Sequence, residues 1–441
     1  MRKKSLLALT LATAMAAGVL AGCGNKNETT TAAPENNSEV ASSEATGDAE
    51  EKNVDASAYD GKKVKVWVAN EIVGFTEKQI ADFQEKNPQY KGVTFTVEAV
   101  GEGDAASNVI TDVKAAADIY GFAQDQLTRL VTAGALEEVN PDYKDAVLSA
   151  NDDGAVKAGT VGDVMYAYPI TSDNGYFLYY DKSVVKDPST LEGIVKDCEA
   201  AGKNFYFEIN SGWYQTAFFF GTGCTLTYDT DKEGNFTGCN ADYASDKGMV
   251  ALKKMIELKS SSSFQNGSSL SNATNVGAIV DGAWDSSAAK ELFGDNYATA
   301  KLPTFQGADG NTYQLSGFSG NKLLGVKPQE DTDKLQICDD LAYYLSSEEV
   351  QLARFDEVGW GPSNKNAQAN EKVASDEALK ALGEQVAFDI PQGQYPDEYW
   401  KLATGLGDSI ISDTLTANTS DDDLLKALTD FQNTCKSYAG Q

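Results

Sequence analysis

The stretch GKKVKVWVANEIVGFTEKQIADFQEKN, residues 61–87, decides the fold class. Side chains in 61–68 alternate between polar and apolar, which predicts a β-strand. Residues 76–87 carry apolar side chains at the spacing of one helix face, and Thr76 is a suitable N-terminal cap for that helix. VTFTVEAV at 93–100 then predicts a second strand. The folded part of the chain therefore opens on a strand, a helix and a strand.

The same alternation continues along the chain. We expect a helix near 105–117, a strand over 118–122 and a helix over 125–133, which together predict a parallel-type sheet with helices on both faces. After Pro169 the pattern changes, and 172–180 is aromatic and strand-like. Further helices are expected at 334–345, 348–358, 376–387 and over most of 397–438. About 380 residues are too many for one core, so the expected fold class is α/β with two domains.

The N-terminus carries the features of an export signal. The positive residues MRKK at 1–4 precede an apolar run over 6–20, which is too short to span a membrane. The run ends in Leu-Ala-Gly-Cys, which resembles the lipid-attachment site of bacterial lipoproteins. We therefore expect a signal peptide over 1–22, a lipid on Cys23, and a location at the extracellular face of the cell membrane. Residues 23–59 hold few aliphatic or aromatic side chains, so they are expected to form a disordered tether.

Composition excludes several classes of function. The chain has 66 acidic and 36 basic residues, and this formal charge of −30 repels nucleic acid and anionic lipid and argues against an anionic ligand. It has no histidine, which excludes histidine-based nucleophilic catalysis and histidine-bound zinc. The main enzymatic chemistry left open is a carboxylate pair acting on a glycosidic bond. We expect neither a metal nor a cofactor.

Five cysteines follow Cys23, and none of them belongs to a C-x-x-C motif of the kind that binds metal or exchanges disulfides. Residues 224–239 read as a β-hairpin around a loose turn, and its expected register places Cys224 near Cys239. A disulfide between these two residues and free thiols are both open.

Four short motifs occur in order along the chain. They are DIYGFAQD at 118–125 followed by AGALEEVNPD, YAYPI at 166–170 leading to YYDK, VDGAW at 280–284, and LPTF at 302–305. Together these motifs resemble those of the extracellular solute-binding proteins for sugars, over residues 62–434. Within that family the chain looks closest to the maltose- and maltodextrin-binding branch.

The resemblance implies two α/β lobes joined by a hinge that the chain crosses more than once, with the ligand in the cleft between them. The first lobe would comprise 60–172 with 318–370, and the second 173–317 with 371–441. It also implies a monomeric protein without catalysis of its own. Such a protein would bind an oligosaccharide and deliver it to the permease subunits of an ABC importer.

A neutral sugar needs charged acceptors for its hydroxyls and flat aromatic faces for its C–H groups. By position, the resemblance identifies Glu71, Asp104, Asp125 and Asp173 as candidate acids. Asp125 also follows a predicted strand, where the carboxyl end of a strand meets a cleft. The candidate aromatic residues are Phe122, Trp213, Tyr214, Trp284, Trp360 and Trp400.

The chain departs from the maltose branch at three positions. Ile72 replaces a lysine, Gln126 replaces an arginine, and Ser211 replaces an acid. These departures concern contacts at the reducing end of the sugar. The resemblance still implies maltodextrin as the ligand, and the departures leave another oligosaccharide open. An exported glycoside hydrolase and a binding protein for a non-sugar ligand, such as a basic peptide, are the alternatives. The resemblance places the candidate acids on different lobes, which disfavours the hydrolase.

Overall fold

The structure is a computed structural model that describes residues 56–231 and 234–440. The expected signal peptide, Cys23 and the tether up to residue 55 lie outside the described residues. The last part of the tether prediction is wrong, because Ala56–Tyr59 forms a short 3-10 helix, η1, and the Tyr59 side chain is buried. Its ring packs edge-on against Tyr90 with 4.8 Å between the ring centroids. The folded part therefore begins before residue 60.

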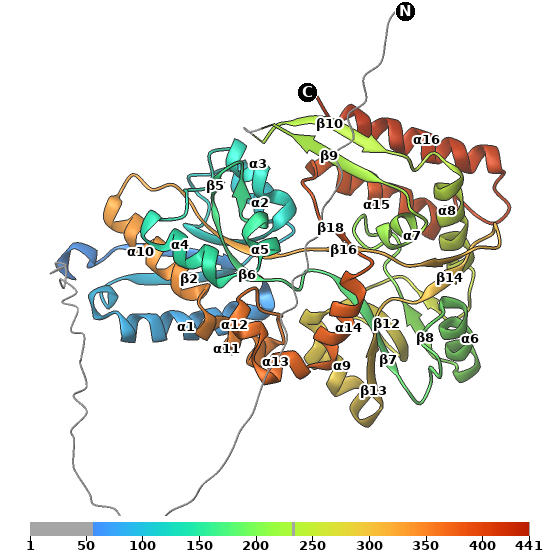
Figure 1. Cartoon of the computed structure of the whole chain (residues 1–441), viewed down its shortest axis with the longest axis horizontal. Helices are drawn as coiled ribbons and strands as arrows, with labels where there is room; N and C mark the ends of the chain where they lie inside the picture. Colours follow the sequence, from blue (N-terminus) through green and yellow to red (C-terminus); the bar gives the residue numbers. More distant parts are fainter. Residues whose placement is uncertain (1–55, 232–233, 441) are drawn as a thin grey trace, which may run out of the picture. The chain divides into compact units, whose positions relative to one another are not determined.

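One five-stranded sheet organises the first lobe (Figure 1). Strand β1 pairs in parallel with β2 and β3, as the alternating pattern predicts, whereas β17 runs antiparallel to both β3 and β6. In the order of the sheet, the strands are β2 (Thr94–Ala99), β1 (Lys63–Val68), β3 (Ile119–Ala123), β17 (Lys322–Val326) and β6 (Ala167–Thr171). The helices around this sheet are α1 (Val73–Lys86), α2 (Ala105–Thr111), α3 (Leu127–Thr132), α4 (Pro141–Ala150), α5 (Asp153–Ala158), α10 (Thr332–Leu345) and α11 (Glu348–Val358).

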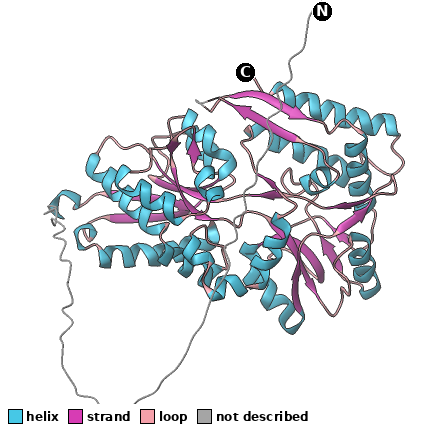
Figure 2. Ribbon diagram, in the orientation of Figure 1, coloured by secondary structure: helices cyan, strands magenta, loops and turns pink. Residues whose placement is uncertain are grey.

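A second five-stranded sheet organises the second lobe. Strand β12 pairs in parallel with β8 and antiparallel with β7. In sheet order, the strands are β11 (Phe264–Gln265), β8 (Asn204–Tyr206), β12 (Val276–Gly282), β7 (Tyr176–Asp181) and β13 (Tyr297–Ala300). The helices of this lobe are α6 (Leu191–Ala201), α7 (Thr216–Gly221), α8 (Asp246–Lys259), α9 (Ser286–Phe293), α14 (Glu377–Val386), α15 (Asp397–Ile411) and α16 (Asp421–Ser437). Figure 2 shows that helices flank the strands in both lobes.

The described chain crosses between the lobes three times. It leaves the first sheet after β6, returns to it just before β17, and leaves the first lobe again between α11 and α14. Gly359 ends α11 with φ +77°, a conformation that suits glycine, and the next residue, Trp360, is still buried in the core of the first lobe. The returning segment forms β16 (Phe318–Ser319), which pairs with β18 (Ile390–Pro391) between the two sheets. The residue limits given above for each lobe stay a prediction.

Smaller elements complete the described chain. They are the hairpins β4 (Thr160–Val161) with β5 (Val164–Met165), β9 (Leu226–Thr230) with β10 (Phe236–Ala241), and β14 (Thr304–Gln306) with β15 (Thr312–Gln314), and the helices α12 (Lys365–Gln368) and α13 (Glu371–Ser375).

Several predicted helices differ from the structure at their ends. Helix α1 begins at Val73, and the buried Thr76 hydroxyl donates to the carbonyl of Ile72, so Thr76 is not its cap. The helix predicted over 105–117 ends at Thr111, because the Asp112 carboxylate accepts hydrogen bonds from two following backbone amides and forms a turn. The helical pattern of 397–438 belongs to two helices, and Ser420 caps the second of them.

The predicted hairpin is confirmed, but its register is wrong. Cys239 on β10 lies opposite Tyr228, and Cys224 lies before β9 begins. Cys198, Cys224, Cys239, Cys338 and Cys435 are all free thiols. Of the two alternatives for Cys224 and Cys239, the structure shows free thiols and no disulfide.

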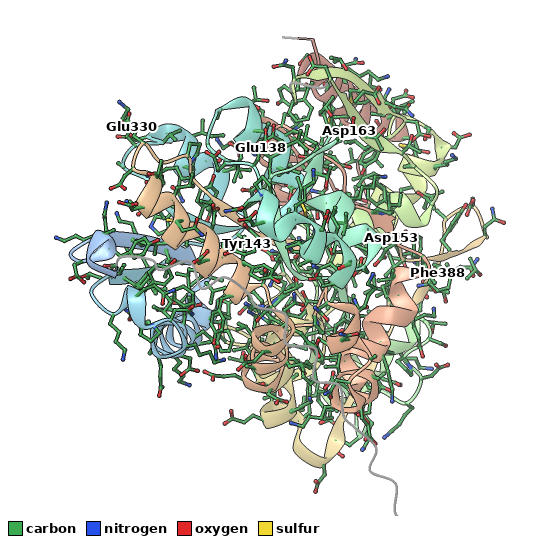
Figure 3. All side chains as sticks on the ribbon, turned by 60° about the vertical axis from the view of Figure 1, so that its left-hand side comes forward. Glu138, Tyr143, Asp153, Asp163, Glu330 and Phe388 are labelled. Atoms are coloured by element: carbon green, nitrogen blue, oxygen red, sulfur yellow. The ribbon has the colours of Figure 1, made fainter. Side chains whose placement is uncertain are left out.

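The described surface carries many acidic side chains. Figure 3 shows Glu138, Asp153, Asp163 and Glu330 on the outside of the first lobe, and all four are exposed. Among the described residues, no helix combines the length and the apolar character that a bilayer span requires.

Candidate functional site

One wall of a pocket is built where strands of the first sheet end. Glu71 lies three residues after the end of β1, the turn 101–104 follows β2, and Asp125 lies two residues after the end of β3. Because β1, β2 and β3 are parallel neighbours, their carboxyl ends meet at one edge of the sheet. The side chains of Glu71, Glu102, Asp104 and Asp125 therefore line the same pocket. We call this surface the acidic wall.

Gln126 orders the acidic wall. Its side-chain amide donates to the carbonyls of Glu102 and Gly103, at 2.7 Å each, and its side-chain oxygen accepts from the amide of Ala106 at 2.8 Å. A buried glutamine thus joins the turn after β2 to the turn after β3. This gives a structural role to the residue that replaces the arginine of the maltose branch. Ile72, at the second departure, is buried in the core of the first lobe.

The opposite wall carries three tryptophans of the second lobe. Trp284 lies two residues after the end of β12, Trp213 lies between β8 and α7, and Trp400 lies on α15. All three indole rings are partly buried, and the Trp213 and Trp284 rings lie 6.1 Å apart at an angle of 41°. The indole N–H of Trp213 donates to the side-chain oxygen of Gln392 at 3.2 Å. We call this surface the aromatic wall.

The backbone around the aromatic wall has little spare room. A Cβ atom at Gly282 would lie 2.1 Å from the Trp284 ring, so only glycine lets the ring fold back over β12. Ser211 accepts hydrogen bonds from the amides of Trp213 and Tyr214 and so shapes their loop. The third departure from the maltose branch is therefore a turn-forming residue.

Between the two walls lies a cavity of about 380 Å³. Six of the ten residues predicted from the sequence line it: Glu71, Asp104, Asp125, Trp213, Trp284 and Trp400. Its other lining side chains, which sequence reasoning missed, are Glu102, Ala123, Gln126, Asn174, Lys322 and Gln392.

The structure does not bring the other four predicted residues to the cavity. Phe122 is fully buried in the first lobe, because strand alternation turns its side chain away from the face that Ala123 presents to the pocket. Tyr214 is buried behind Trp213 with 4.9 Å between the rings. Asp173 is buried, and its carboxylate accepts from the Gly361 amide at 2.6 Å. Trp360 is 1% exposed and packs in the core of the first lobe.

Burial changes the protonation of the acidic wall. Asp125 is 3% exposed, and burial raises its pKa to about 7, with the Arg129 charge opposing the effect. Arg129 is itself paired with Asp397 of the second lobe at 3.3 Å. Burial also raises the pKa of Glu102, and the charge of Lys322 opposes that effect. The wall therefore combines exposed carboxylates with carboxyl groups that hold their protons more tightly.

The carboxyl groups of the pocket all lie on one of its two walls. All four carboxyl groups come from the first lobe, so the expectation that the candidate acids lie on different lobes is wrong for the residues that line the pocket. A glycosidase needs two carboxyl groups flanking the scissile bond, whereas the three tryptophans that line the described pocket belong to the wall opposite the acids. The described residues contain no group of side chains that could hold a metal ion.

Known proteins share this architecture. A family profile described as bacterial extracellular solute-binding protein matches residues 78–381. A galactooligosaccharide-binding protein of Bacillus subtilis (strain 168) is 24% identical over 306 residues, which are 65% of this chain and 70% of that protein. A structure solved with acarbose is 29% identical, with a TM-score of 0.74 over 86% of this chain and 99% of its own. The maltodextrin-binding protein of L. casei BL23, solved without ligand, is 26% identical, with a TM-score of 0.67 over 85% and 98% of the two chains. These similarities confirm the predicted two-lobed α/β fold.

Proposed function

This chain belongs to the bacterial extracellular solute-binding proteins, and from that premise we propose that it is the sugar-binding component of an ABC importer. It binds an oligosaccharide between the acidic wall and the aromatic wall. The observation that carries the proposal is the pairing of three tryptophans with four carboxyl groups across one cavity. Carboxylates accept hydrogen bonds from sugar hydroxyls, and indole faces cover the apolar C–H faces of sugar rings.

The number of aromatic rings in the site agrees with the binding free energy that an importer needs. Each stacked ring contributes about 1–2 kcal/mol, and micromolar binding requires about 8 kcal/mol. Three stacked rings with several charge-assisted hydrogen bonds reach that value. No further cofactor or metal is required for this activity.

We propose an α-glucan of the maltodextrin type as the ligand. Support comes from the motifs shared with the maltose branch and from two similar proteins, one solved with acarbose and one named a maltodextrin-binding protein. The Bacillus subtilis relative is named for galactooligosaccharides, so these are the second ligand class to examine. Ile72 and Ser211 stand where the maltose branch carries a lysine and an acid. These replacements support a different sugar preference at one end of the site.

We further propose that the protein acts outside the cell as a lipoprotein and has no catalytic activity. The sequence Leu-Ala-Gly-Cys supports lipid attachment at Cys23, and the following segment would act as a tether to the membrane. The two lobes would present the loaded ligand to the permease subunits of the transporter.

Calorimetric titration tests the proposed function. The chain from residue 24, which lacks the predicted signal peptide and Cys23, is titrated with maltotriose, longer maltodextrins, galactooligosaccharides and unrelated oligosaccharides. We expect micromolar or tighter binding to α-glucans, with no cleavage products by mass spectrometry. Binding only to another sugar would change the proposed ligand but leave the proposed role in import unchanged. Turnover of any sugar would support the hydrolase instead, and failure to bind any oligosaccharide would contradict the proposal.

A further inference from the structure

Lys322 is an unusual member of the pocket. It is the first residue of β17 and lies opposite Ala123 in the register, so its side chain starts at the same sheet edge as the acidic wall. The residue is 4% exposed. Its ammonium group lies 3.3 Å from the centroid of the Trp360 ring and 5.1 Å from that of Trp284. Among the described residues no acceptor takes a hydrogen bond from this ammonium, which lies over the two indole rings and interacts through its charge with Glu102.

Glu102 presents the complementary gap. Its side chain lies beside Gly121 of β3, where a Cβ atom would be 3.8 Å from the Glu102 Cγ, an ordinary contact distance. The carboxylate oxygen Oε1 is buried and has no hydrogen-bond partner in the described structure. A buried acceptor without a donor costs about 1–3 kcal/mol, and more when it is charged. Lys322 and Glu102 thus line one cavity, one with unused donors and the other with an unused acceptor.

A single chemical group satisfies both residues. A hydroxyl accepts a hydrogen bond through its oxygen and donates one through its proton, so it can bridge an ammonium and a carboxylate. We propose that Lys322 and Glu102 together bind hydroxyl groups of the sugar ring that stacks on Trp284, and that this pair selects an uncharged ring at that position. The inference rests on the proposed function and specifies the class of sugar at one subsite.

The charges around the pair explain the selection. An amino sugar would bring a second cation next to the Lys322 ammonium, where the indole faces already hold one positive charge. A uronic acid would bring an anion into a cavity whose lining holds four carboxyl groups against the single ammonium of Lys322. A neutral hydroxyl avoids both penalties and fills the unused donor and acceptor.

Titration with modified trisaccharides tests the pair. The chain from residue 24 is titrated with maltotriose, with each of its monodeoxy derivatives, and with trimers that carry an amine or a carboxylate on one ring. We expect at least one monodeoxy derivative to bind about 10–100-fold more weakly than maltotriose, because the missing hydroxyl leaves a charged group of the pocket without a partner. The charged trimers should lose at least as much affinity at the same ring.

Variants separate a binding role from a structural one. In the double variant Lys322→Met with Glu102→Gln, maltotriose should bind more weakly, and the sensitive monodeoxy derivative should bind within about threefold of maltotriose. A merely structural role would lower affinity for all the sugars alike and keep their ratio. Lys301→Met is the matched control, because the Lys301 ammonium also lies over an aromatic ring, that of Phe388 at 4.9 Å, outside the pocket. Figure 3 labels Phe388, which is exposed.

Two results would overturn the inference and leave the proposed function in place. One is wild-type binding of every monodeoxy and charged trimer within threefold of maltotriose. The other is a double variant that keeps the wild-type ratios between sugars. If the wild-type chain prefers other oligosaccharides, the amine-bearing and carboxylate-bearing derivatives of galactotriose serve as the probes, and a preference for either charged form overturns the inference. The absence of binding to any oligosaccharide would contradict the proposed function itself.

Discussion

Asp125 allows the energetic cost of the acidic wall to be measured. Burial raises its pKa from 3.8 to about 7 in the folded chain, whereas the unfolded chain ionises it at the ordinary value. Between these two values the folded state holds a proton that the unfolded state has lost. The free energy of unfolding therefore falls as pH rises through this window. Asp125→Asn removes the titrating group and should flatten that part of the pH profile.

The expected magnitude follows from the two pKa values. From pH 5 to the folded pKa of about 7 the window spans about 2 pH units, which corresponds to about 3 kcal/mol at 1.36 kcal/mol per unit. Any water that reaches the Asp125 carboxyl group through the cavity reduces this free energy. We therefore expect Asp125→Asn to gain about 1–3 kcal/mol in unfolding free energy relative to wild type between pH 5 and pH 8.

Urea unfolding followed by tryptophan fluorescence at several pH values measures this difference. Asp339 and Asp389 also have pKa values raised by burial, to about 6 and about 7, and both remain in the variant, so only the difference between the two chains is diagnostic. Asp163→Asn serves as the control at an exposed carboxylate of the same lobe and should leave the profile unchanged. Parallel profiles for wild type and Asp125→Asn would refute the reasoning.

Three further substitutions test the construction of the two walls. Trp284→Ala should weaken sugar binding at least about tenfold through lost stacking, as measured by calorimetry. Gly282→Ala should weaken binding to a similar degree although Trp284 is retained, because the new Cβ would lie 2.1 Å from the present position of the Trp284 ring and would displace it. Unchanged affinity would contradict this packing. Gln126→Ala should lower the unfolding free energy by about 1–3 kcal/mol and weaken binding, because the Ala106 amide and the carbonyls of Glu102 and Gly103 lose their partners. A denaturation midpoint equal to that of wild type would contradict this role.

The local part of the site could be predicted from the sequence. Residues 61–133 alternate between strand and helix patterns, and acids that follow successive parallel strands must meet at one sheet edge. The family resemblance also identified Trp213, Trp284 and Trp400, which line the cavity, and Trp284 lies in one of the four quoted motifs. In both cases the information lies in short segments whose own patterns determine where the side chain points.

The non-local part could not be predicted. Lys322 reaches the pocket only because β17 inserts antiparallel between β3 and β6, and nothing in its neighbouring residues signals that insertion. Trp360 follows a glycine in a loop sequence that suggests exposure, yet it packs beneath the Lys322 ammonium. Phe122 is a miss with an available signal, because the alternation of its own strand opposes it to Ala123.

The separation of the two walls has a consequence for unloading. Every carboxyl group of the pocket belongs to one lobe and every tryptophan to the other, so a ligand held by a single lobe would keep either its contacts with the carboxyl groups or its stacked faces, but not both. A small parting of the lobes therefore removes one whole kind of interaction at once, rather than weakening all contacts gradually. A transporter that pulls the lobes apart would convert a tight complex into a fast-dissociating one in a single step, without having to compete for any individual hydroxyl.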